Sequence, residues 1–453
     1  MIKVTCTDET GKLRETRGAV FANRDITWRR DYKSSGPTAT AKTEKSPVVE
    51  VFPEEKHQEI LGFGGAFTDA SCYLINSLEE DKRNELIENF FSPSEMNFNI
   101  GRTTVAQCDF GRVCYSYNDT PDDIDMKNFS IDYDREYIIP TIRKAREINP
   151  DLYLLSSPWS PPGWMKTGGL MTGGWMRQKY LEAFANYYLR YLQEYAEAGI
   201  KLNAMTTQNE TETDQCSQMP ACYWHPELEM SFIRDYMVPL LKKNDINVEI
   251  WLMDHNYIMW RRAKWMLDDP DFKGTVSGIA YHLYQGSAEA MTWVHDAHPE
   301  IDVHMTEVGG GTSELTSDAI CRITKGFNEI LQNFAKSIFC WNLALDEKGK
   351  PNIGPFMKRA GIIQINSQTQ EIQYNDQYWA LAHYSRFIKR GARQIASKCD
   401  HENISQSAFI NPDGNYVVVV TNNGPEEDIS LDIQGRYAIV EIPEKSVCTL
   451  TFK

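Results

Sequence analysis

Eight apolar, strand-like runs alternate with helical stretches between about residues 61 and 390, and few folds accommodate that order. Each run is apolar along its whole length, as expected for parallel strands that are covered on both faces. The spacing is that of repeated strand–helix units. The alternation therefore predicts an α/β protein built as a (β/α)8 TIM barrel. The runs are Leu61–Thr68, Phe98–Asp109, Leu152–Trp159, Leu202–Glu210, Val248–Asn256, Val276–Tyr284, Asp302–Gly309 and Ser337–Leu345, with amphipathic stretches such as Arg177–Ala198, Pro226–Lys243 and Ser317–Ala335 between them.

The ends of all eight runs carry polar or aromatic residues. A barrel gathers the C-terminal ends of its strands on one face, so these side chains are expected to converge on one pocket. They are Asp69, Asp109, Trp159, Asn209 with Glu210, Asp254 with His255 and Asn256, His282 with Tyr284, Glu307, and Trp341 with Asn342.

Two of these residues, Glu210 and Glu307, indicate the chemistry. Most glutamates are solvated surface groups, so the prediction depends on the shared position of this pair at strand ends. Cleavage of a glycosidic bond needs one carboxylic acid to protonate the leaving oxygen and one carboxylate to attack the sugar. We predict that Glu210 is the general acid/base and that ionised Glu307 is the nucleophile. The nearby charge of Glu307 would help Glu210 to keep its proton.

Residues near the two glutamates are predicted to bind the sugar or to orient the carboxylates. Asn209 would donate a hydrogen bond to a sugar hydroxyl, and such a bond strengthens as positive charge develops on the ring. Arg102 would keep Glu307 ionised or form a structural ion pair in the barrel mouth, and the two roles are compatible. His282 would orient a carboxylate, with Tyr284 beside it in the mouth.

Two tryptophans offer flat apolar faces on which the C–H face of a sugar can stack. Trp159 lies in the proline-rich segment Ser157–Lys166, and we favour a ligand contact for its ring over a purely structural role. Trp341 ends the eighth run and could form the floor of the pocket.

The flanks of the barrel differ from its centre. Four short strand-like runs follow about residue 391, and turn residues separate them. Ile2–Thr7 and Val48–Phe52 also look like strands. We therefore predict an antiparallel β-sandwich built from both chain ends: residues 1–54 supply N-terminal strands, 55–390 form the barrel and 391–453 form the C-terminal β-domain. The four runs are Tyr416–Thr421, Asp428–Ile433, Tyr437–Ile442 and Ser446–Phe452.

Net charge and the distribution of apolar residues limit which binding partners and which cellular location are expected. The net charge of −16 argues against nucleic acid and anionic membrane surfaces, which attract basic patches. No run has the length of a membrane span. The first residues lack the apolar core of a signal peptide, so the expectation is a cytoplasmic protein.

The ten cysteines follow no disulfide framework, and we expect reduced thiols. Cys108 with Cys114, and Cys216 with Cys222, are the pairs that could form. Neither spacing is that of a zinc site, so no metal or other cofactor is expected.

The barrel residues resemble glycoside hydrolase family 30, which includes glucosylceramidase and related β-glycosidases. The resemblance covers roughly residues 55 to 360. It implies a retaining mechanism with Glu210 as acid/base and Glu307 as nucleophile, and a β-domain built from both chain ends. It also implies glycone contacts by Asp69, Trp159, Asn209 and Trp341, with Arg102 and Tyr284 near the nucleophile. The motifs that carry it are 61–69 (LGFGGAFTD), 157–166 (SPWSPPGWMK), Asn209-Glu210, Thr306-Glu307 and Trp341–Leu345.

Three departures from the glucosylceramidase pattern bear on the substrate. Arg102 is followed by Thr103 and Thr104 rather than Val and Pro, Leu283 replaces an aromatic residue, and the segment Thr211–Trp224 differs beside the acid/base. These changes lie on the aglycone side. They leave the chemistry in place and put the ceramide assignment in question, while carbohydrate and sphingolipid metabolism remain the expected contexts.

The expected activity is that of a glucosylceramidase-like exo-β-glucosidase acting on β-glucosides or short β-gluco-oligosaccharides. A β-xylosidase, a β-fucosidase or an endo-β-1,6-glucanase of the same family is the alternative. Two further classes are a metal-dependent barrel hydrolase using Asp254, His255 and His282, and a non-catalytic carbohydrate-binding barrel. The first lacks paired His motifs, and the second has no need of an acid and a nucleophile.

Overall fold

The structure is a computed structural model that describes residues 1–453 apart from 8–12, 17, 24–45, 214–218, 310–315 and 357. The chain forms two compact units. The sheet unit comprises Met1–Phe63, Gly311–Lys336 and Tyr374–Lys453, and the barrel unit comprises Gly64–Gly310 and Ser337–Gln373. None of the described helices combines the length and the apolar character that crossing a bilayer requires.

The barrel unit confirms the predicted (β/α)8 fold. Eight strands close in the sequence order β5 to β12, and the registers are parallel, for example Gly65 opposite Gly101 in β5 and β6. Each strand lies within or close to one predicted run. The strands are β5 (Gly62–Phe67), β6 (Ile100–Val105), β7 (Tyr153–Pro158), β8 (Ala204–Thr206), β9 (Glu249–Asn256), β10 (Gly278–His282), β11 (Asp302–Val308) and β12 (Ala335–Cys340).

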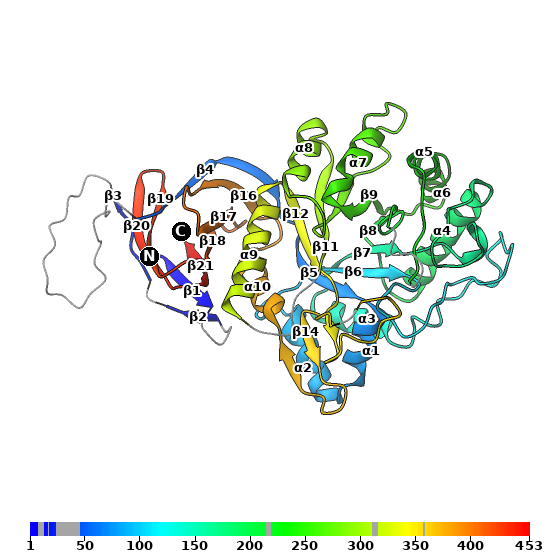
Figure 1. Cartoon of the computed structure of the whole chain (residues 1–453), viewed down its shortest axis with the longest axis horizontal. Coiled ribbons are helices and arrows are strands. Elements are labelled where there is room, and N and C mark those ends of the chain that lie inside the picture. The colour runs from blue at the N-terminus through cyan, green and yellow to red at the C-terminus, as the bar shows by residue number, and fades with distance from the viewer. Residues whose placement is uncertain (8–12, 17, 24–45, 214–218, 310–315, 357) are drawn as a thin grey trace, which may run out of the picture. The chain divides into compact units, whose positions relative to one another are not determined.

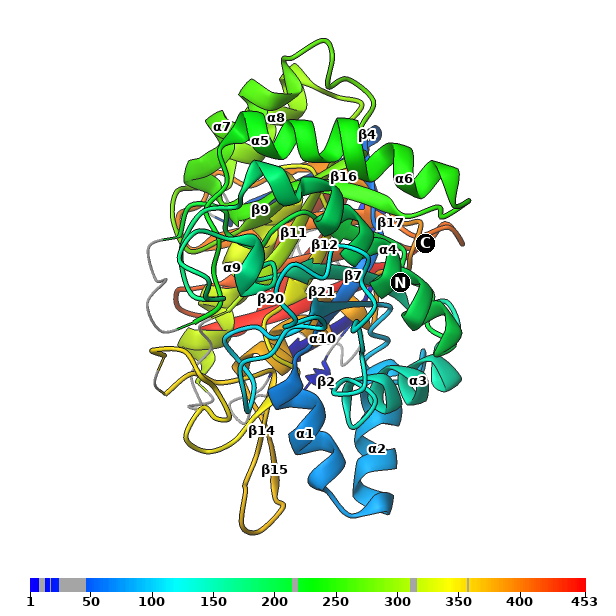
Figure 2. The same cartoon turned by 90° about the vertical axis from the view of Figure 1, so that its right-hand side faces the viewer.

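Helices surround these strands on the outside (Figure 2). Their apolar faces are buried against the barrel; in α4, four tyrosines at 187, 188, 191 and 195 are fully buried on that face. The sequence 226–243 is one helical stretch with a π-helical centre, Phe232–Met237. The helices are α1 (Asp69–Ser77), α2 (Glu80–Phe91), α3 (Ile138–Ile148), α4 (Leu181–Glu197), α5 (Pro226–Ser231), α6 (Val238–Lys243), α7 (Trp260–Leu267) and α8 (Glu289–Ala297). Three short strands, β13 (Ala344–Leu345), β14 (Ile363–Ile365) and β15 (Ile372–Tyr374), form a separate small sheet.

The sheet unit contains a ten-stranded sheet built from both ends of the chain, in the order β2-β1-β21-β18-β17-β16-β4-β19-β20-β3 (Figure 1). Its strand pairs are antiparallel except β4 with β19, which are parallel. Side chains such as Val4, Val49, Ile429 and Leu450 form its core. The strands are β1 (Lys3–Thr7), β2 (Leu13–Glu15), β3 (Ala22–Asn23), β4 (Val48–Glu59), β16 (Arg393–Lys398), β17 (Ile404–Ile410), β18 (Tyr416–Asn422), β19 (Glu427–Ile433), β20 (Arg436–Ile442) and β21 (Ser446–Phe452), and the helices are α9 (Ser317–Gln332) and α10 (Asp376–Ser385).

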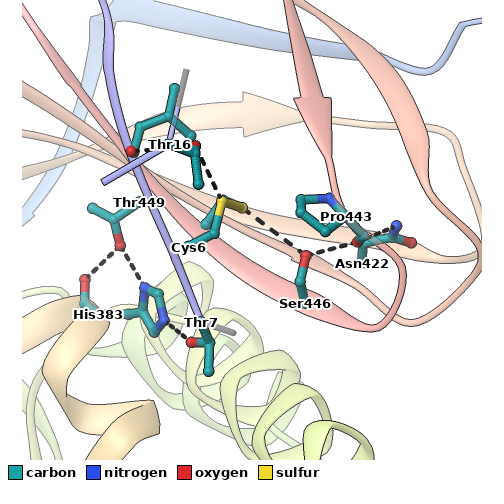
Figure 3. Close-up of a disulfide and its surroundings, with 10 residues drawn as sticks. Cys6, Thr7, Thr16, His383, Asn422, Pro443, Ser446 and Thr449 are labelled. Carbon is teal, nitrogen blue, oxygen red and sulfur yellow. Dashed lines mark hydrogen bonds between the residues drawn. A yellow bond between two sulfur atoms is a disulfide. The ribbon is translucent and has the colours of Figure 1, made fainter. Parts of the chain in front are cut away.

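A disulfide between Cys6 of β1 and Cys448 of β21 joins strands that are 442 residues apart in sequence (Figure 3). The following residues, Thr7 and Thr449, both hydrogen-bond the imidazole of His383 on α10. Burial lowers the pKa of His383 to about 3, so this imidazole is neutral. The expectation that the cysteines are reduced is wrong for this pair, because antiparallel pairing places the two residues opposite each other. Cys108, Cys114 and Cys222 are free thiols, and Cys216 lies outside the described residues.

Candidate active site

A cavity of about 300 Å³ opens where the barrel strands end. Seven of the eight predicted strand-end groups line it, and all come from the barrel unit. Phe110, Phe356 and Arg359 add an aromatic and basic wall. The lining residues that carry the argument are Asp109, Trp159, Asn209, Glu210, Glu212, Thr213, His255, Asn256, Tyr284, Glu307 and Trp341.

Glu210 and Glu307 face each other across this cavity. Glu307 is the sixth residue of β11, whereas Glu210 follows β8 by four residues and has a left-handed backbone with φ of 49°. The N–H of Glu210 donates to the carbonyl of Asp254 at 3.0 Å and so fixes this turn. One carboxylate oxygen of each glutamate lies within 4.8 Å of the other. The structure therefore brings together the two carboxylates that the sequence singled out.

Arg102 of β6 lies beneath the nucleophile and is completely buried. Its guanidinium donates to Glu307 Oε2 at 2.5 Å, to Asp254 Oδ2 at 2.9 Å and to Asn209 Oδ1 at 2.8 Å. Burial disfavours the charge, but Asp254 and Glu307 outweigh burial and raise the pKa of Arg102. Tyr284 donates to the other oxygen of Glu307 at 2.8 Å. Both oxygens of the proposed nucleophile are thus held by donors that favour the carboxylate.

His282 lies between the carboxylates of Glu210 and Asp254 and hydrogen-bonds both of them. Its Nδ1 lies 3.0 Å from Glu210 Oε1 and its Nε2 lies 3.0 Å from Asp254 Oδ1. Burial lowers the pKa of His282, yet the charge of Glu307 and the hydrogen bonds to Asp254 and Glu210 raise it to about 9. For Glu210, burial raises the pKa, but the hydrogen bond and charge of His282 bring it below its usual range. Both shifts favour the form of the pair in which His282 carries the proton and Glu210 is ionised.

Asp254 holds this network from below. Its carboxylate accepts from Arg102, His282, Thr206 and Thr306, all at 2.7–3.0 Å. Burial raises the pKa of Asp254, but Arg102 and His282 keep it well below its usual range. The sequence had placed Asp254 among the strand-end groups and in the metal-dependent alternative, but nothing in its spacing shows that it lies under Arg102.

A bulge at the end of β9 sets the positions of Asp254 and His255. Met253 pairs with Ala280 and His255 pairs with Tyr281, so Asp254 is the extra residue. Met253 and Asp254 have φ of 77° and 48°, a conformation that non-glycine residues seldom adopt. Neighbouring strand residues normally point to opposite faces. The bulge breaks that alternation, so that Asp254 meets Arg102 while His255 lines the cavity.

Trp159 and Trp341 lie side by side in the wall of the cavity, with ring centres 5.0 Å apart and planes inclined by 19°. The guanidinium of Arg102 lies 4.9 Å from the centre of the Trp159 ring. Asn209 lines the cavity and accepts from Arg102, which leaves its amide N–H groups for a ligand. These placements agree with the binding roles predicted for Trp159, Asn209, Trp341 and Tyr284.

Asp69 is not at the site, contrary to the sequence prediction. β5 ends at Phe67, Thr68 caps α1, and Asp69 is already in the first turn of that helix. Its carboxylate accepts from the side chain and N–H of Arg112 and does not line the cavity. Asp109 lines the cavity instead, with Oδ1 unpartnered among the described residues. Burial, reinforced by the charge of Glu307, raises the pKa of Asp109 well above its usual range.

Glu210, His282 and Glu307 each place one potential metal ligand within 4.8 Å of the others. Arg102 already binds Glu307 Oε2, and both ring nitrogens of His282 face carboxylate oxygens. A guanidinium at that position repels a cation, and an imidazolium has no lone pair to offer. The donor set therefore fits proton transfer better than metal binding.

Comparison with known proteins agrees with this geometry. Residues 60–388 match the model of the glycosyl hydrolase family 30 TIM-barrel domain, and residues 391–450 match that of the family 30 beta sandwich domain. The lysosomal acid glucosylceramidase of Mus musculus is 30% identical over 428 residues, covering 89% of this chain and 82% of that protein. An endo-1,6-beta-D-glucanase of Neurospora crassa is 27% identical over 415 residues, covering 86% and 84%.

The solved structure of the endo-beta1,6-glucanase BT3312 superimposes with a TM-score of 0.85 at 26% identity and covers 99% of each chain. The family match spans both the barrel and the β-sandwich, and the barrel carries a carboxylate pair suited to glycoside cleavage. The chain therefore belongs to glycosyl hydrolase family 30.

Proposed function

We propose that this glycoside hydrolase is a retaining β-glucosidase that acts on β-glucosides or short β-gluco-oligosaccharides. The separation of Glu210 and Glu307 carries the proposal, because their nearest oxygens lie within 4.8 Å. Retaining enzymes keep the two carboxyl groups about 5–5.5 Å apart, whereas inverting enzymes need about 6.5–9.5 Å to admit a water molecule.

In the first step, Glu307 attacks the anomeric carbon and forms a glycosyl ester. The bond from that carbon to the glycosidic oxygen breaks, and the oxygen takes a proton from Glu210. In the second step, Glu210 removes a proton from water while the water oxygen attacks the same carbon, and Glu307 leaves as a carboxylate. Arg102 and Tyr284 hold Glu307 before and after both steps.

The proton for the first step belongs to the His282–Glu210 pair. A sugar that fills the cavity displaces water from Glu210 and favours its neutral form, since desolvation penalises the charged carboxylate. When His282 passes its proton to Glu210, the imidazole becomes neutral and no longer stabilises the carboxylate. This change likewise favours the protonated form of Glu210. The pair therefore titrates as one coupled unit.

The names of the relatives suggest two classes of substrate. The mouse relative is named a glucosylceramidase, whereas the fungal and structural relatives are named endo-1,6-glucanases. We place a glucosyl residue at the end of the cavity lined by Asp109, Trp159 and Trp341. The leaving group then lies beside Glu210, and its identity separates the two classes.

A panel of nitrophenyl β-glycosides tests the class and the glycone. We expect wild type to hydrolyse the β-glucoside faster than the xyloside, fucoside and galactoside, and Glu307→Ala to hydrolyse none. Proton NMR of the first product should show β-glucose before mutarotation. Initial release of the α-anomer would contradict retention, and preference for another glycoside would replace glucose as the glycone.

Glucosylceramide and a β-1,6-linked glucose oligomer, offered side by side to wild type, address the leaving group. Release of glucose only from the chain end would indicate an exo enzyme. Release of internal oligosaccharides would favour the endo-1,6-glucanase alternative.

A further inference from the structure

His255 lines the cavity and has a ring nitrogen, Nδ1, that lacks a hydrogen-bond partner in the described part of the chain. It is 6% exposed and lines the cavity beside Glu210. Its Nδ1 lies 3.9 Å from Glu210 Oε1, too far for a hydrogen bond, and Nδ1 has no partner among the described residues. A buried polar group without a partner is costly, so such groups in native structures call for an explanation.

The backbone of β9 is strained at the place that puts His255 there. The left-handed residues Met253 and Asp254 form the bulge that turns His255 into the cavity. A left-handed backbone is unfavourable for residues other than glycine, and strain of this kind collects at functional sites. One result of this bulge is the ion pair between Asp254 and Arg102. The orientation of His255 is the other result of the same bulge.

His255 is not a second acid/base at neutral pH. Burial, only partly opposed by the charge of Glu210, lowers its pKa to about 4. A neutral imidazole has one N–H donor and one nitrogen acceptor. Such a group suits a hydroxyl, which can accept from the first or donate to the second.

We propose that His255 is a specificity residue that hydrogen-bonds a hydroxyl of the leaving group, beside the glycosidic oxygen that Glu210 protonates. This inference rests on the proposed function, because it takes Glu210 as the acid. The occupant we infer is a second sugar residue. Glu212, Thr213 and Asn256, which adjoin Glu210 and His255 along the chain, also line the cavity and offer further polar groups.

The experiment compares three β-glucosides in wild type and in variants of His255. A β-linked glucose disaccharide has a basic leaving group with hydroxyls, octyl β-glucoside has a basic leaving group without them, and nitrophenyl β-glucoside has neither property. The readout is the ratio of kcat/KM for the disaccharide to kcat/KM for the octyl glucoside. His255→Phe keeps the ring volume and removes both polar atoms. His255→Asn restores a polar group near the position of Nδ1.

We expect His255→Phe to lower this ratio about ten-fold, the value of one good hydrogen bond, and His255→Asn to recover part of the loss. His255→Leu, which also lacks polar side-chain atoms, serves as a second loss variant if phenylalanine is not accommodated. His225→Phe is the control, because His225 is exposed, stacks on Trp175 and does not line the cavity. Its ratio should match wild type.

An unchanged ratio in both loss variants would overturn the inference. Equal losses on the disaccharide and the octyl glucoside, with the nitrophenyl glucoside spared, would also overturn it, because His255 would then act through the proton of Glu210. With glucosylceramide as a fourth substrate, a loss confined to it would reject the sugar and leave a hydroxylated lipid. Failure of wild type on every β-glucoside would instead refute the proposed function itself.

Discussion

Arg102 is the residue on which the charge balance of the site depends. It is a single buried cation in contact with Asp254 and Glu307. Removal of one partner from a buried ion pair leaves uncompensated charge and costs about 3–5 kcal/mol. We therefore expect Arg102→Met to lower the free energy of unfolding by that amount, measured by urea titration at pH 7.

Arg112→Met provides the comparison for Arg102. Arg112 is partly exposed and pairs with Asp69 away from the cavity. Its loss should cost less than that of Arg102, because water can reach the space that the partly exposed guanidinium leaves and the backbone N–H of residue 112 still donates to Asp69. Equal costs at the two positions would show that the active-site network does not depend on Arg102 in this way.

His282 controls the proton of Glu210, and this gives a prediction about pH. The imidazolium, with its pKa of about 9, stabilises the Glu210 carboxylate. In wild type the pair keeps its shared proton up to the pKa of His282, about 9. His282→Gln leaves that proton on Glu210 alone, a carboxyl whose usual pKa is about 4.3. The basic limb of the kcat/KM profile should therefore move downward by about one pH unit or more, while the maximal rate falls. A basic limb that stays in place or moves upward would contradict the shared proton.

At this scale, the sequence could predict residues that end a strand and face inward. Glu210, Glu307, Trp159 and Trp341 follow from that logic. It failed for Asp69, because a helix begins directly after β5 and turns that carboxylate toward Arg112. It placed His255 only among the strand-end groups and in the metal-dependent alternative, because the bulge that aims this residue is a backbone feature that local sequence does not reveal.

At the scale of elements, strand β5 lies so close to strand β6 that one position of β5, residue 64, requires glycine. A Cβ on Gly64 would lie 1.9 Å from the carbonyl oxygen of Ile100, which cannot move without breaking the pairing of β5 with β6. A Cβ on Gly65 would meet only the side-chain ends of Ile362 and Leu343, at 2.7 and 2.9 Å.

These contacts predict different costs for two neighbouring substitutions. Gly65→Ala should lower the free energy of unfolding by about 1–3 kcal/mol, because flexible side chains can move aside. Gly64→Ala should cost more than about 4 kcal/mol or prevent accumulation of folded protein. Denaturant titration of the two purified variants decides the matter, and a larger loss for Gly65→Ala would refute the argument.

The eight barrel strands could be predicted because each lies in a separate apolar run. Their ends were less predictable: the run predicted as Leu202–Glu210 contains a strand of only three residues, Ala204–Thr206. Beyond Thr206 the chain follows hydrogen bonds from Asn209 to Pro158 and from Glu210 to Asp254. Those contacts join residues about 50 positions apart or fewer and are set by the closed barrel, so local pattern does not encode them. The parallel pairing of β4 with β19 was missed for the same reason.

For the whole molecule, the Cys6–Cys448 bond gives a prediction about stability. A disulfide that closes a long loop restricts the unfolded chain and typically contributes about 2–4 kcal/mol. Cys6→Ser should therefore destabilise the sheet unit by roughly that amount, and addition of a reductant to wild type should have the same effect. Cys399→Ser, at a half-buried free thiol of the same unit, is the matched control. If Cys6→Ser, reduced wild type and Cys399→Ser were all as stable as oxidised wild type, the prediction would be contradicted.

The same bond offers a test of location. Disulfides persist mainly in oxidising compartments, whereas the sequence led us to expect a cytoplasmic protein. Alkylation of free thiols in protein taken directly from its source, followed by mass spectrometry, reports the state of Cys6 and Cys448. A cytoplasmic enzyme should show both alkylated, and a protein from an oxidising compartment should show neither.

The position of β1 also limits the order of events during synthesis. β1 is translated long before its partner β21, which ends at Phe452. No nascent chain can complete this part of the sheet until all the residues between these two strands have left the ribosome. The barrel strands emerge in the order in which they pair, so they can assemble progressively while β1 waits. An unpaired strand edge of that kind favours association with other chains. We therefore expect the ribosome-bound intermediate, rather than the finished enzyme, to be the form that most needs a chaperone.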